Sequence, residues 1–169
     1  MSGSRRAVAA VVVGEELGPL VVPVTRERLI AYAAASGDHN RIHWDEPFAR
    51  SVGLPDVIAH GMWTMGAAAE LVASWAGDPT AVVGYRTKFT APVVVPYAEG
   101  TQIEVRGRVK SLTADHPLGP RAVVELVVTC AGEQVLSRAQ ATLALAPAPA
   151  PAPAPAGDAT GPEDRQRDA

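Results

Sequence analysis

Residues 61–77 read GMWTMGAAAELVASWAG, and this stretch decides the fold. Its residues are apolar or small almost throughout, with Glu70 and Ser74 as the main exceptions. A helix that lacks a polar face is one that other elements surround, so we expect a long helix at the centre of the domain. The glycine and alanines of residues 66–69 keep that helix slim, which lets strands approach it closely.

Four segments after this stretch have the pattern of strands. Less polar and more polar residues alternate in YRTKFT (85–90) and in TQIEVRGRVKSL (101–112), and this period of two is typical of half-buried antiparallel strands. RAVVELVVTC (121–130) and QVLSRAQATLAL (134–145) follow, joined by a short hairpin signal at residues 131–133. A further strand is expected near the N-terminus.

These elements together predict an α+β fold. A twisted antiparallel sheet must cover its apolar face, and the helix of residues 61–77 is the only candidate of sufficient length. We therefore expect an antiparallel sheet wrapped around a long central helix. Such a sheet has exposed edges, which favours pairing into a dimer.

Two shorter helices are expected before the central one. Thr25 is a good N-cap for RERLIAYAAAS (26–36), and Gly37 is a natural stop. Asp45 is a similar cap for EPFARSV (46–52). The chain between these two helices should therefore form a short connection.

Length and composition limit the possible functions. A chain of 169 residues is long enough for one domain with a real core. The net charge of −3 and the scattered arginines argue against nucleic acid as a partner. The single cysteine, Cys130, rules out an internal disulfide. Every apolar stretch is shorter than the roughly 20 residues that span a membrane, so we expect a cytoplasmic protein without a membrane partner.

Both ends of the chain differ from its middle. Two arginines precede the apolar run AVAAVVV, which resembles the start of a signal peptide but is ended early by two glutamates. Residues 1–6 are interpreted as a disordered tail and residues 7–145 as the single domain. From residue 146 the chain reads APAPAPAPAPA and then becomes charged, so residues 146–169 are predicted to be a disordered, extended tail.

The connection between the two short helices carries a candidate acid/base pair. In YAAASGDHNRIHWDE (32–46), Asp38 precedes His43 by five positions, and a His60-Gly61 step opens the central helix downstream. A carboxylate and an imidazole beside a helix N-terminus are what proton transfer next to a carbonyl requires. Structural readings stay open, since Asp38 could cap a turn and His43 could be a core histidine.

The order Y-A-x-x-S-G-D-x-N-x-I-H-x-D with I-A-H-G-M downstream resembles the MaoC-like (R)-specific hydratase and dehydratase family, which has the hot-dog fold. Within it, SGDHNRIHWDE, VIAHGMWTMG and SWAGDP are similar to the B subunits (HadB) of (3R)-hydroxyacyl-acyl carrier protein dehydratases of mycolic-acid-type fatty acid elongation. The resemblance covers roughly residues 24–145.

The resemblance implies catalytic roles for Asp38 and His43, and we expect His43 at the C2 proton and Asp38 at the hydroxyl or water. It implies that the backbone N–H groups of the helix start bind the thioester oxygen. The residues expected at the oxyanion are Gly61 and Met62, and those expected to support the site are Asn40, Ser36 and His60. One departure is visible, because Arg41 stands where the family has proline.

The function implied is dehydration of a (3R)-3-hydroxyacyl thioester, or the reverse hydration, with acyl carrier protein or coenzyme A as the carrier. No metal and no cofactor are expected. The partner would be a second copy or a related hot-dog subunit. Alternatives are an enoyl-CoA hydratase of degradation or polyester precursor supply, a non-catalytic acyl-binding subunit and, more weakly, a thioesterase.

Overall fold

The computed structural model describes residues 4–148; the remainder of the predicted N-terminal tail and residues 149–169 of the Ala-Pro tail lie outside the described residues. Residues 4–6 were predicted to be a disordered tail, but the structure packs them on the domain. The Arg6 amide donates to the Ala76 carbonyl at 2.8 Å, and Arg5 pairs with Asp78 at 2.9 Å.

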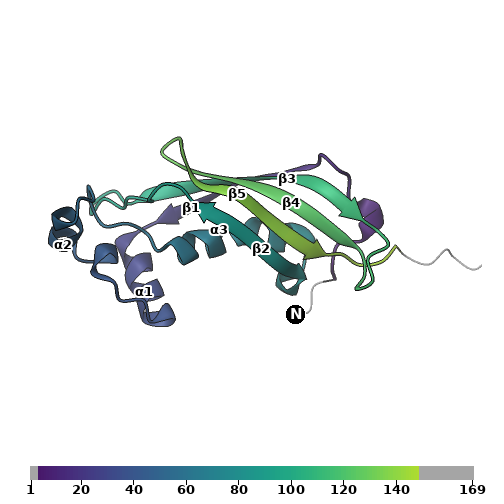
Figure 1. Cartoon of the computed structure of the whole chain (residues 1–169), viewed down its shortest axis with the longest axis horizontal. Coiled ribbons are helices and arrows are strands. Elements are labelled where there is room, and N and C mark those ends of the chain that lie inside the picture. Colours follow the sequence, from purple (N-terminus) through teal and green to yellow (C-terminus); the bar gives the residue numbers. More distant parts are fainter. Residues whose placement is uncertain (1–3, 149–169) are drawn as a thin grey trace, which may run out of the picture.

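A five-stranded antiparallel sheet packs on one long helix (Figure 1). The strand order is β1-β3-β4-β5-β2, so β1 and β2 are the edges. The elements, in chain order, are η1 (Val8–Ala10), β1 (Glu16–Val24), α1 (Arg26–Ser36), η2 (Arg41–His43), α2 (Glu46–Ser51), α3 (Gly61–Ala76), η3 (Pro79–Ala81), β2 (Val82–Phe89), β3 (Thr101–Thr113), β4 (Arg121–Cys130) and β5 (Glu133–Ala144). The predicted α+β architecture is confirmed. Among the described residues no helix is both long and apolar enough to cross a membrane.

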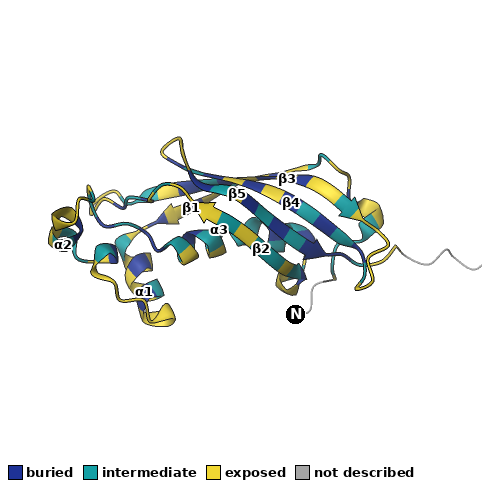
Figure 2. Ribbon diagram, viewed as in Figure 1, coloured by how far each residue is buried: buried dark blue, intermediate teal, exposed yellow. Residues whose placement is uncertain are grey.

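The central helix α3 is covered on one side only. Its buried residues recur every four positions: Thr64, Ala68, Val72 and Ala76. The opposite side includes Met62, which is 59% exposed, and the exposed Gly66 and Glu70 (Figure 2). The expectation that other elements surround this helix is therefore wrong for the chain alone. The sheet of a single chain reaches one face of the helix, although the helix is apolar on more than that face.

Local capping positions the two helices before α3. The Thr25 hydroxyl accepts the amide of Arg28 at 3.3 Å, and Gly37 ends α1 in the left-handed region at φ 75°. The Asp45 carboxylate accepts the Phe48 amide at 3.1 Å and so begins α2. Both predicted caps and the stop at Gly37 are confirmed.

The sheet places its alternating residues as the sequence indicated. Ile103, Val105 and Val109 of β3 are buried in the core, and Cys130 is buried at the end of β4. The β4–β5 hairpin turns at residues 131–132, both of which have positive φ. The sheet therefore presents a continuous apolar face to α3.

Candidate active site

The connection between α1 and α2 is ordered by its own polar groups. The Ser36 hydroxyl donates to the Tyr32 carbonyl at 2.8 Å and accepts the amide of Asp38 at 3.2 Å. The Asp38 carboxylate in turn accepts the Asn40 amide at 3.2 Å. Asp38 is thus held just past the end of α1, where its amide donates to the Ser36 hydroxyl.

A single turn of 3-10 helix, η2, directs His43 inward. The Asn40 side chain caps this turn by accepting the Ile42 amide at 3.3 Å, and the Asn40 carbonyl accepts the amide of His43 at 3.1 Å. Asn40 therefore shapes the segment, and it contacts Asp38 and His43 through its backbone rather than its side chain. Trp44 follows, 48% exposed, and its indole N–H donates to the His39 carbonyl at 3.1 Å.

The imidazole of His43 is oriented by a backbone carbonyl. Its Nδ1 lies 2.7 Å from the oxygen of Ile58, and because a carbonyl can only accept, Nδ1 must carry the proton. In the neutral ring the Nε2 atom is then a free base. The residue is buried, at 7% exposed.

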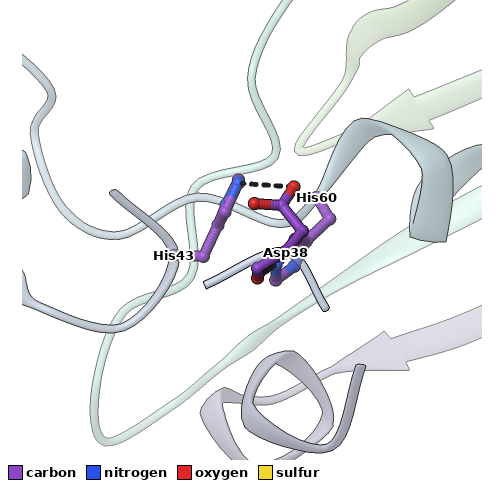
Figure 3. Close-up of side chains that lie close together, drawn as sticks. All are labelled: Asp38, His43 and His60. Carbon is purple, nitrogen blue, oxygen red and sulfur yellow. Dashed lines mark hydrogen bonds and ion pairs between the residues drawn. The ribbon is translucent and has the colours of Figure 1, made fainter. Parts of the chain in front are cut away.

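The carboxylate of Asp38 faces this free nitrogen. The Asp38 Oδ2 and His43 Nε2 atoms are 3.9 Å apart, and the Asp38 side chain is 52% exposed (Figure 3). Burial lowers the pKa of the His43 imidazole below its usual value; the nearby His60 acts in the same direction, while the Ile58 carbonyl and Asp38 oppose it. The neutral, basic form of His43 therefore persists to lower pH than in a free histidine.

His60 joins the two members of the pair. Its Nε2 donates to the Asp38 carbonyl at 3.1 Å, and its ring stacks on that of His43 with centroids 3.7 Å apart. The ring of Tyr32 packs against it at 4.9 Å. His60 is 1% exposed, so it is a buried neighbour of the pair.

A cavity of about 330 Å³ opens beside His43 at the N-terminus of α3. Its lining is mainly apolar and consists of His43, Ile58, Ala59, Gly61, Thr64, Phe89, Thr90, Ala91, Pro92, Val93, Val135 and Leu136. The His60 side chain does not cap α3, so the first amides of the helix have neither an intrahelical nor a capping partner. A Cβ at Gly61 would lie 3.0 Å from the Phe89 ring, so glycine lets that ring close over the helix end.

The structure brings Asp38, His43 and His60 together beside Gly61 and leaves the Met62 side chain outside. Met62 lies in a different groove, against α1, and does not line the cavity. The sequence reasoning missed Ile58 and Phe89. Ile58 opens the I-A-H-G-M motif, but nothing local marks its carbonyl as a partner of His43. Phe89 has no local signal, because it reaches the site through the tertiary fold.

Asp38, His43 and His60 also form the one group of three metal-ligating residues found in the described part of the chain, with their ligand atoms within 4.8 Å of one another. The two imidazoles are stacked, 23° from parallel, and one nitrogen of each faces a carbonyl. Their remaining lone pairs lie in two nearly parallel ring planes and do not converge on one point. The geometry favours acid/base chemistry over metal binding.

Fold and site define a hot-dog protein with a carboxylate–imidazole pair beside a cavity. The family model described as "MaoC like domain" matches residues 9–117, and the chain belongs to this family. The R-hydratase PhaJ1 of Pseudomonas aeruginosa superposes with a TM-score of 0.72 over 85% of this chain and 88% of that chain, at 24% identity. The hot-dog fold predicted from the sequence is confirmed.

Two further relatives are longer proteins. A solved MaoC-like dehydratase is 38% identical with a TM-score of 0.79, over 86% of this chain and 44% of that chain. The 3-hydroxyacyl-thioester dehydratase X of Mycobacterium tuberculosis is 42% identical over 83 residues, which are 49% of this chain and 29% of the relative. The chain thus spans less than half the length of either.

These comparisons do not distinguish HadB from the other MaoC-like relatives. The truncated HadBC complex of Mycobacterium tuberculosis superposes with a TM-score of 0.63, over 79% of this chain and 97% of that chain, but at 21% identity. That likeness shows the fold alone. The predicted membership holds at the level of the MaoC-like family.

Proposed function

We propose that this chain is a hydro-lyase that removes water from (3R)-3-hydroxyacyl thioesters and, in reverse, adds water to 2-enoyl thioesters. The observation that carries the proposal is the 3.9 Å approach of Asp38 to the free nitrogen of His43, beside a mainly apolar cavity. Relatives named as 3-hydroxyacyl-thioester dehydratase and as R-hydratase support it.

His43 supplies the base for the C2 proton. In dehydration, its Nε2 lone pair takes that proton, and the electron pair of the C–H bond moves towards the thioester oxygen. The resulting enolate expels the hydroxyl from C3, so the C–O bond breaks as the C2–C3 double bond forms. A positioned acid or base of this kind contributes typically about 10²- to 10⁴-fold.

Asp38 holds the hydroxyl that leaves. A hydroxyl that donates to its carboxylate also lies next to Nε2, because the two residues approach within 3.9 Å. The imidazolium formed by deprotonation of C2 returns its proton to this hydroxyl, which departs as water. Both residues end as they began, and hydration follows the same path in reverse.

The start of α3 stabilises the charge that develops on the thioester oxygen. The backbone N–H groups of Gly61 and Met62 belong to the first turn, where helix amides lack internal partners and the helix dipole is positive. One such donor is worth about 3 kcal/mol in comparable sites. Only the backbone of Met62 has a role here, since its side chain points elsewhere.

The finer assignment is to fatty acid elongation of the mycolic-acid type, with the acyl chain on acyl carrier protein. Hydration of an enoyl-CoA in degradation or polyester precursor supply would use the same residues. A second hot-dog unit, identical or related, completes the protein. Two solved structures support this, because the ChsH1–ChsH2 and HadBC matches are complexes of two different chains.

The test is hydration of short- and long-chain 2-enoyl-CoA, followed by the loss of enoyl absorbance. Asp38→Asn and His43→Gln should each lower kcat by about 10²-fold or more. Asp115→Asn and His116→Gln make the same chemical changes in the exposed β3–β4 loop and should keep the wild-type rate. Rates on carrier-protein thioesters then separate elongation from degradation.

Two results would overturn the assignment. Wild-type rates in both dyad variants would show that Asp38 and His43 are not the acid/base pair. A wild-type chain that is inert at every chain length, alone and with a co-expressed related subunit, would instead identify a non-catalytic acyl-binding subunit.

A further inference from the structure

Arg26 is the centre of a partly buried charge network behind the active site. It is the first residue of α1, and its side chain is 15% exposed. Its Nε donates to the Val95 carbonyl at 2.9 Å, and its terminal nitrogen pairs with Glu46 at 3.0 Å and with Asp56. One guanidinium thus joins the start of α2, the loop before α3 and the segment after β2.

The stability of α1 does not explain this placement. A cation in the first turn of a helix faces the positive end of the helix dipole, which is unfavourable. A desolvated charge is also costly unless it is paired and hydrogen-bonded. Arg26 is paired with two carboxylates, Glu46 and Asp56, and both lie in the chain between His43 and His60.

Hydrogen bonds and two steps along the backbone link this network to His43. The carboxylate of Asp56 accepts the Val57 amide at 2.6 Å, and the Val57 carbonyl accepts the Val95 amide at 2.9 Å. The next residue is Ile58, whose carbonyl accepts Nδ1 of His43 at 2.7 Å. The atom that orients the imidazole is therefore two residues from the carboxylate that Arg26 holds.

Further backbone hydrogen bonds hold Ile58 and Ala59 in place. The Ile58 amide donates to the Ile42 carbonyl at 3.1 Å, next to His43 itself. The Ala59 amide donates to the Val93 carbonyl at 2.8 Å. These backbone bonds and the bond between Val57 and Val95 hold residues 57–59, and the ion pair with Arg26 fixes Asp56, the residue that precedes them.

We propose that Arg26 is a positioning residue for the reaction: by clamping Asp56, Glu46 and the Val95 carbonyl together, it holds the Ile58 carbonyl against Nδ1 of His43 and so aims Nε2 at the substrate. The proposal rests on the function proposed above. It assigns no contact between Arg26 and the substrate.

Arg26→Lys is the main test variant. Lysine keeps the charge but is a single-point donor, so it cannot bind three oxygens in the fixed geometry of a guanidinium. Because a misplacement of about 1 Å can cost about 10²-fold, kcat should fall by about 10-fold or more, while KM stays within about 3-fold. Asp56→Asn, which keeps the shape of the partner, should act in the same direction.

The pH profile separates positioning from stability. Burial is the largest cause of the lowered pKa of His43, and the Ile58 hydrogen bond opposes it; the charged or titratable neighbours are His60 and Asp38. Loss of the Ile58 bond lowers this pKa further, and neutral His43 is the active base. The pH at which kcat/KM falls on the acid side should therefore move lower in Arg26→Lys. If Arg26 had only a structural role, Arg26→Lys would lower the melting temperature and leave the acid side of the kcat/KM profile unchanged.

Arg50→Lys is the matched control. Arg50 pairs with the same Glu46 at 2.9 Å, but its side chain is 60% exposed and it makes neither the Asp56 nor the Val95 contact. It should keep the wild-type kcat and pH profile. An equal loss in both variants would refute the proposal.

A spectroscopic measurement keeps this test independent of turnover. Long-range ¹H–¹⁵N spectra report which nitrogen of His43 carries the proton. The wild type should show the Nδ1–H form, and Arg26→Lys and Asp56→Asn should show a mixture of the two neutral forms. An unchanged tautomer and an unchanged kcat in both variants would overturn the proposal. If the wild type were inactive but the variants still showed a disturbed tautomer, only the proposed reaction would be overturned.

Discussion

Gly61 is the first residue of α3, lines the cavity and lies against Phe89 of β2. A Cβ there would lie 3.0 Å from Cε1 of Phe89, and the other nearest atoms belong to the same ring. Gly61→Ala should therefore displace either the ring or the first turn of α3 and lower kcat/KM by about 10-fold, because in the proposed reaction the amides at this turn face the substrate oxygen. Steady-state kinetics check this result.

Gly66→Ala is the control on the same helix. A Cβ at Gly66 would have no neighbouring atom within 4 Å beyond the helix itself. The change should raise the free energy of unfolding by about 0.5–1 kcal/mol, because glycine destabilises a helix relative to alanine by this amount. It should have no effect on kcat/KM. If Gly61→Ala also left kcat/KM unchanged, the close approach of Phe89 to Gly61 would not contribute to catalysis.

The residues found from the sequence are those whose roles are local. Asp38 and His43 are five positions apart and sit between two helices with clear caps, so their proximity follows from short-range rules. Arg26, Ile58 and Phe89 reach the site through contacts that span tens of residues. Such contacts leave no periodicity and no cap, so the sequence does not reveal these roles, even for Ile58, which opens the I-A-H-G-M motif.

At the scale of an element, the turn η2 shows how the chain accommodates Arg41. The residue before it, Asn40, has φ −58° and ψ 128°, which is the conformation that proline imposes on its predecessor. The guanidinium of Arg41 turns away from the dyad, pairs with Asp45 at 2.6 Å and lies over the Phe48 ring at 4.4 Å. The family's proline would fit this backbone.

Arg41→Pro should consequently be tolerated. The ion pair it removes lies at the surface and contributes little to stability, whereas the stiffer unfolded chain returns about 0.4–1 kcal/mol. We expect a free energy of unfolding within about 1 kcal/mol of wild type and kcat within about 3-fold, measured by urea denaturation and enoyl-CoA hydration. A loss of kcat of about 10-fold or more would mean that the guanidinium takes part in catalysis.

At the scale of the whole molecule, two neighbouring surfaces are left apolar and open. The outer side of α3 is uncovered, and the edge strand β2 exposes Val83 by 52% and Phe89 by 48%. An edge strand with exposed apolar residues is suited to pairing with another strand.

We therefore expect dimers in light scattering, and Val83→Lys should weaken them by about 10-fold or more in dissociation constant, the effect of about 1.4 kcal/mol. Val127→Lys is the matched control, because Val127 is 48% exposed on the central strand β4. A dimer that persists unchanged in Val83→Lys would exclude this edge as the interface.

The composition of α3 predicted its central position but not how much of it one chain would cover. An apolar sequence shows that a helix avoids water, whereas the identity of the covering surface depends on how many strands a chain supplies and where they end. The buried stripe through Ala68 and Val72 packs within the chain, and the side that carries Gly66 is exposed.

The intrinsic fluorescence of Trp44 can report on the segment that carries His43. The chain has three tryptophans, and Trp63 and Trp75 of α3 are partly buried against the core. Trp44 is next to His43, is half exposed, and donates to the His39 carbonyl within the segment. Its fluorescence should therefore respond to an acyl ligand in the cavity and to a partner seated nearby, and Trp44→Phe would give the background signal of the other two indoles.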